Sequence, residues 1–148
     1  MHYFILLILS LNVLWFSMGF RFFCFKSEST TKMLLSKEHR IEPFYSIITH
    51  AVKFIGAFNL AFAMLSVICL VKYHYPILDS DWNIALFFVF FMAHFGQFWV
   101  NLPIALKEKR KMQPLWPVLK GRMYFIFKTD LVLAVCNLII SVYLFGIK

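Results

Sequence analysis

Four long runs of apolar residues alternate with polar connections along the chain. The runs cover residues 3–23, 44–71, 82–106 and 123–147, and each is near or above the roughly 20 residues that a helix needs to cross a ~30 Å hydrocarbon core. The runs lack the regular alternation of outer-membrane strands, so they predict helices. We therefore expect an all-α integral membrane protein. Its fold would be a left-handed four-transmembrane-helix bundle with antiparallel neighbours, one transmembrane domain over residues 1–148.

Composition supports this class. Of the 148 residues, 61% are hydrophobic and 15% are charged, against about 25% charged in an average soluble domain. This excludes a disordered chain. No Lys or Arg precedes the first run, which is also longer than the apolar core of a signal peptide, so we expect it to be a retained helix.

Basic residues concentrate in two of the three connections. Residues 24–43 with their flank and residues 107–122 hold eleven of the fifteen Lys and Arg residues. The positive-inside rule predicts that both connections face the cytosol and that both termini lie on the opposite side. The membrane would be the endoplasmic reticulum in a eukaryote or the inner membrane in a bacterium. The second connection is also an expected surface for anionic lipids, formed by Lys107, Lys109, Arg110, Lys111, Lys120 and Arg122.

Every apolar run carries at least one polar residue, and such residues tend to point into a bundle rather than toward lipid. In the third run His94, Gln97 and Asn101 lie within about 60° of one another on a helix. The prediction is a buried polar cluster with an ion pair between Lys53 and Asp130, because an unpaired lysine in mid-membrane is costly. The predicted members are His50, Lys53, His94, Gln97, Asn101 and Asp130. Two roles stay open: hydrogen bonds that only hold helices together, or contact with a ligand.

No motif indicates a dedicated catalytic or metal site. The histidines lack metal-ligand spacing, the three cysteines form no Cys-x-x-Cys pair, and neither a candidate triad nor a glycine-rich phosphate loop is present. We expect no metal, no cofactor, no catalytic residue and no nucleic-acid partner, and an enzyme is the less favoured class.

Two stretches resemble small four-helix membrane families. VKFIGAFN (52–59) resembles the second helix of the ergosterol-biosynthesis scaffold family, and AHFGQFW (93–99) is similar to its third helix, with Gln97 in place of a Glu and Trp99 one position late. With FSMGFRFF (16–23), the same pattern is also similar to DoxX-like proteins. The first resemblance implies a non-catalytic scaffold for enzymes at the endoplasmic reticulum. The second implies a small accessory protein, in some members with quinone-linked redox or chaperone partners.

The sequence therefore predicts an accessory or scaffold protein that binds other integral membrane proteins. The alternative is a protein that binds a lipid, a sterol, a quinone or another apolar small molecule in a polar cavity in the cytosolic half of the bundle. Co-purified proteins would indicate the first function, and a bound lipid or quinone the second.

Overall fold

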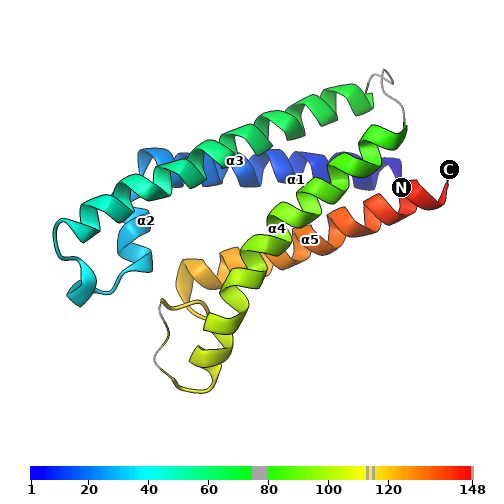
Figure 1. Ribbon diagram of the computed structural model, residues 1–148. Helices are drawn as coiled ribbons and strands as arrows, with labels where there is room; N and C mark the ends of the chain where they lie inside the picture. The colour runs from blue at the N-terminus through cyan, green and yellow to red at the C-terminus, as the bar shows by residue number, and fades with distance from the viewer. Residues whose placement is uncertain (75–79, 113, 115, 148) are drawn as a thin grey trace.

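The computed structural model describes residues 1–74, 80–112, 114 and 116–147, and their secondary structure is helical (Figure 1). The four long helices are α1 (His2–Phe20), α3 (Phe44–His74), α4 (Ser80–Lys109) and α5 (Gly121–Gly146). All four are long and apolar enough to cross a membrane, and α1 reaches this length together with the π-helical turn η1 (Arg21–Phe25) that continues it. The predicted four-helix transmembrane bundle is confirmed.

The bundle consists of two antiparallel helix pairs. Helix α1 packs along α3, and α4 packs along α5. Both termini lie at one end of the molecule, where the pairs are close together, and the pairs diverge toward the opposite end (Figure 1). The diverging end carries α2 (Ser27–Leu34) on one pair and the connection between α4 and α5 on the other.

A hydrophobic core fills the end at which the pairs meet. It joins Ile5 and Leu9 of α1 to Phe90 of α4 and Ile140 of α5, all of them 0–1% exposed. Aromatic stacking extends this core toward the middle of the bundle, where the Phe16 ring lies 4.7 Å from the His94 ring between centroids. Burial of these side chains holds the two pairs together at this end.

Helix α2 lies within the first basic connection, begins at Ser27 and has no side-chain cap. The Thr30 hydroxyl instead donates to the Phe22 carbonyl at 3.0 Å, which fixes α2 against the end of η1. At its other end, the Arg40 guanidinium donates to the carbonyls of Lys32 and Leu35, satisfying acceptors that the last helical turn leaves open.

Helix α3 extends beyond the hydrocarbon thickness. Its 31 residues span about 46 Å at 1.5 Å per residue, against a ~30 Å core. Its first turns lie beside the polar helix α2, since Tyr45 hydrogen-bonds to the Glu28 carbonyl and Thr49 to Thr31. The beginning of α3 therefore lies at the level of the polar connection, not in the middle of the membrane.

Candidate functional site

A buried polar cluster joins three helices at mid-length. It consists of Asn12 and Trp15 from α1, His94 from α4, and Asp130 and Asn137 from α5. All except the half-buried Trp15 are 0% exposed. Because α1 belongs to one helix pair and α4 and α5 to the other, the cluster connects the two pairs with hydrogen bonds.

Asp130 is held by two donors from opposite pairs. Its Oδ1 accepts from the Trp15 indole Nε1 at 2.9 Å and lies 3.2 Å from His94 Nδ1. The other histidine nitrogen, Nε2, lies 3.1 Å from Asn12 Oδ1 and donates to it, because an amide oxygen is only an acceptor. A single proton between His94 Nδ1 and Asp130 Oδ1 would make this contact a hydrogen bond and leave the pair electrically neutral, which suits a low-dielectric interior.

The two asparagines complete the cluster. Asn12 Nδ2 donates to Asn137 Oδ1 at 2.9 Å, and Asn137 Nδ2 donates to the Leu133 carbonyl at 2.8 Å and more weakly to Asn12 Oδ1 at 3.3 Å. One polar atom is left over: Asp130 Oδ2 is buried and has no hydrogen-bond partner among the described residues. Buried carboxylate oxygens seldom lack a hydrogen-bond partner, and among the described residues Asp130 Oδ2 is the unsatisfied acceptor of this cluster.

Next to this cluster, a cavity of about 370 Å³ opens between the diverging helix pairs. Its wall is largely apolar, with the side chains of Met18 and Phe22 from one pair facing Phe125 and Ile126 from the other. A few polar groups interrupt that wall: Ser29, Thr30, Asn59, Gln97 and Arg122. This volume and this mixture are typical of small-molecule sites, which range from about 300 to 1,000 Å³.

Trp15 lies between the cavity and the other members of the polar cluster. Its ring is part of the cavity wall, and its Nε1 is bound to Asp130. Two other residues of the cavity wall lie next to the cluster along their helices: Gln97 is one turn from His94 on α4, and Ile126 is one turn from Asp130 on α5. Along the bundle axis the apolar core is thus followed by the polar cluster and then by the cavity.

The predicted cluster is only partly present. His94 and Asp130 come together, whereas Gln97 lines the cavity. Asn101 belongs to another contact: its Oδ1 accepts from the Trp116 indole at 3.0 Å, and its Nδ2 donates to the Gln97 carbonyl. The stripe of three polar residues on α4 therefore serves three different environments.

The predicted ion pair between Lys53 and Asp130 is wrong. His50 and Lys53 are exposed on α3, and the described ion pair of Asp130 is with His94. If the membrane span began at the first residue of the predicted run 44–71, Lys53 would lie about 14 Å deep. The Lys53 carbonyl instead lies 3.6 Å from Cys24 Sγ, at the level of the turn that leads into α2, where an exposed lysine can extend its ammonium group to the polar region.

Three members of the cluster were missing from the predicted set: Asn12, Trp15 and Asn137. The signal for the asparagines was present, because each stands inside an apolar run where a polar side chain avoids lipid. No comparable signal pointed to Trp15, since tryptophans in membrane helices commonly lie at the interface.

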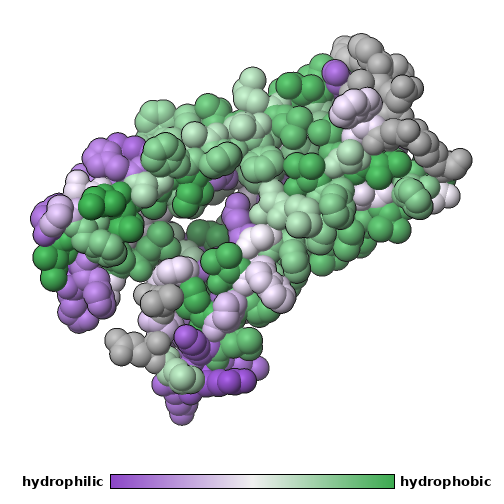
Figure 2. Space-filling model, viewed as in Figure 1, coloured by the Kyte–Doolittle hydropathy of each residue, from purple (hydrophilic) through white to green (hydrophobic). Residues whose placement is uncertain are grey.

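The predicted lipid surface is divided among different places. Lys111 and Lys120 line a second hollow, of about 780 Å³, between α2 and the α4–α5 connection. Arg122 lines the cavity. The remaining predicted members, Lys107, Lys109 and Arg110, are exposed and line neither hollow. Hydrophilic side chains gather at the diverging end of the molecule, and hydrophobic ones cover most of the rest of the visible face (Figure 2).

Within the described part of the chain, no three histidine, cysteine or carboxylate side chains converge as metal ligands would. Comparison with known proteins found no matching family model, curated protein or solved structure. The two family resemblances therefore stay predictions.

Proposed function

We propose that this multi-pass membrane protein binds one amphipathic lipid, or a comparable apolar small molecule, in the cavity between its helix pairs. The observation that carries the proposal is the cavity itself, about 370 Å³ with a largely apolar wall and a few polar groups. A space of this size with this lining fits an acyl chain or a small ring system, and burying apolar surface against its wall favours binding.

The buried polar cluster supports binding by keeping one wall of the cavity in place. The Trp15 ring is tied to Asp130, which is tied in turn to His94. A wall that is already ordered loses little conformational entropy when a ligand arrives, which favours affinity. In this proposal the cluster positions the site, and no reaction is assigned to it.

The proposed orientation places the cavity in the cytosolic half of the membrane. Both basic connections lie at the diverging end, and the positive-inside rule favours the cytosol for that end. The cavity opens toward the same end, lined by Ser29 and Thr30 of α2 and by Arg122 at the start of α5. A lipid of the cytosolic leaflet would reach it with its head group at the membrane surface.

The test is to fill the cavity and measure bound lipid. Ile126→Trp adds a large side chain to the cavity wall, and Ile139→Trp adds the same volume on an exposed position of the same helix. Wild type and both variants are extracted gently from the same membranes and examined by native mass spectrometry. We expect wild type and Ile139→Trp to retain a lipid-sized adduct and Ile126→Trp to lose it.

The same preparations test the scaffold function, which stays a prediction from the sequence. Equal lipid retention by Ile126→Trp and wild type, together with a membrane protein that co-purifies stoichiometrically with both, would overturn the cavity proposal in favour of the scaffold. Circular dichroism of each variant confirms that the helices are intact before lipid retention is compared.

A further inference from the structure

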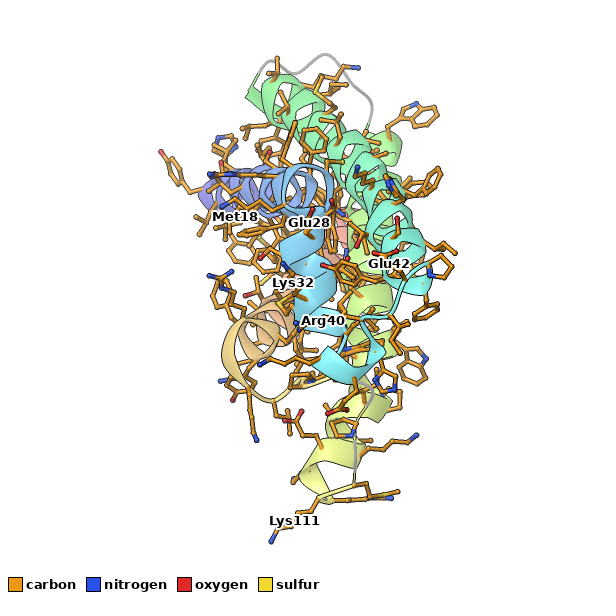
Figure 3. All side chains as sticks on the ribbon, turned by 90° about the vertical axis from the view of Figure 1, so that its left-hand side faces the viewer. Met18, Glu28, Lys32, Arg40, Glu42 and Lys111 are labelled. Carbon is orange, nitrogen blue, oxygen red and sulfur yellow. The ribbon has the colours of Figure 1, made fainter. Side chains whose placement is uncertain are left out.

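The second hollow at the diverging end is strongly basic. Five basic side chains and one carboxylate line it, and they come from two connections that are far apart in sequence: Lys32, Lys37, Arg40, Glu108, Lys111 and Lys120. We call this hollow the basic groove. Figure 3 shows Lys32 and Arg40 along the side of the molecule that leads down to Lys111, with Glu28 and Glu42 placed nearer the beginning of α3.

Glu108 is the one carboxylate among the described residues that line the groove, and it is already engaged. Glu108 Oε2 accepts from the backbone amides of Val118 and Leu119, at 2.7 and 2.8 Å, and so shapes the connection. Arg40 is also engaged, since its guanidinium is bound to the carbonyls at the end of α2. Among the described residues, no ion pair is formed by the four lysines that line the groove. Lysines gathered around one hollow repel each other and favour an anion between them.

The groove and the cavity meet at a shared residue. Met33 of α2 lines both, and Arg122 stands on the cavity side only two residues from Lys120 on the groove side. An apolar space next to a basic one, with Met33 at their boundary, matches the polarity of an anionic amphiphile. Such a molecule places its chain in hydrocarbon and its head group at the interface.

We propose that the basic groove binds the anionic, phosphate-class head group of the same amphiphile whose apolar part fills the cavity. The inference rests on the proposed function and names its ligand class as a lipid with an anionic phosphate head. The proposed head-group site differs from the predicted surface of six basic residues: it includes Lys32 and Lys37 and leaves out Lys107, Lys109 and Arg110.

The experiment compares two charge-matched double variants in nanodiscs of phosphatidylcholine with a minor fraction of phosphatidic acid. Lys32→Gln with Lys111→Gln neutralises the groove, and Lys107→Gln with Lys109→Gln removes the same charge outside it. Native mass spectrometry then gives the ratio of retained phosphatidic acid to phosphatidylcholine. We expect the groove variant to lower this ratio about 30-fold, because two lysines lose charged hydrogen bonds to the head group. The control pair should stay near the wild-type ratio.

Each outcome decides one of the two claims. Equal losses in both pairs would mean diffuse attraction to the membrane surface and would overturn the groove inference. An unchanged ratio in the groove variant would overturn it as well, while loss of all lipid from Ile126→Trp would leave the proposed function standing. Conversely, full lipid retention by Ile126→Trp, with preference lost only in the groove variant, would refute the cavity function.

A soluble probe separates the two sources of phosphate. Glycerol phosphate, added to the nanodiscs, should compete only weakly, because it lacks the chain that occupies the cavity. Displacement of phosphatidic acid by an equal concentration of glycerol phosphate would identify a soluble phosphate ester as the ligand. That result would overturn the inference of a single amphiphile.

Discussion

Replacing Asn12 by leucine tests whether the buried polar cluster holds the two helix pairs together. Asn12 exchanges hydrogen bonds with Asn137 in both directions, at 2.9 and 3.3 Å, and accepts a third from His94 at 3.1 Å. All three bonds link α1 to the other helix pair. Leucine has a higher helix propensity than asparagine and is more favourable in hydrocarbon, so these two effects by themselves would stabilise the variant.

The expected cost follows from these three bonds. Hydrogen bonds between helices in membranes contribute about 0.6 kcal/mol on average and about 1.7 at most, so Asn12→Leu should lose about 2–5 kcal/mol of unfolding free energy. In the Asn12→Leu variant the Asn137 side chain has already lost its hydrogen bonds to Asn12, so a further Asn137→Leu change breaks no additional bond between these two residues. The double variant should therefore lose about 1–3 kcal/mol less than the sum of the single variants.

Unfolding by sodium dodecyl sulfate in mixed micelles, followed by circular dichroism, measures all three variants. Ser17→Leu is the matched control, because it makes the same kind of change at an exposed position of the same helix. If Asn12→Leu unfolds no more readily than Ser17→Leu, the cluster does not hold the pairs together. Strict additivity in the double variant would likewise refute direct pairing of the two asparagines.

The remaining predictions concern packing, the basic connection and topology. A Cβ at Gly56 would collide with Cys24, so Gly56→Ala should destabilise the protein by about 1–3 kcal/mol in the same assay, whereas Gly96→Ala, with open space around it, should cause no loss. Glu108→Ala should speed amide hydrogen exchange in the α4–α5 connection about tenfold or more, because two amides lose a charged acceptor; Glu108→Gln retains an acceptor oxygen and should lose less protection. Reporter fusions at either chain end should stay on the non-cytosolic side, and cytosolic labelling of either fusion would contradict the proposed orientation.

Much of the fold was predictable because a bilayer limits the choices available to the backbone. Long uninterrupted apolar runs have no stable alternative to helices in hydrocarbon, so composition and run length alone indicated four spans. The same constraint indicated that His94 and Asp130 would turn inward, and both are fully buried. The distribution of Lys and Arg also identified the two basic connections, which both lie at the diverging end.

Which polar groups meet was decided by the tertiary structure. Helical periodicity tells which face of a helix a residue occupies, but not which neighbour faces it or at what depth. Asp130 pairs with His94 and Trp15 because α1, α4 and α5 converge there, while the long α3 carries Lys53 to the level of α2. The cavity, too, has no signature in the sequence, because it exists only where the two helix pairs diverge while remaining joined by the core and the polar cluster. The sequence thus determined which segments cross the membrane, and packing between the pairs decided what they enclose.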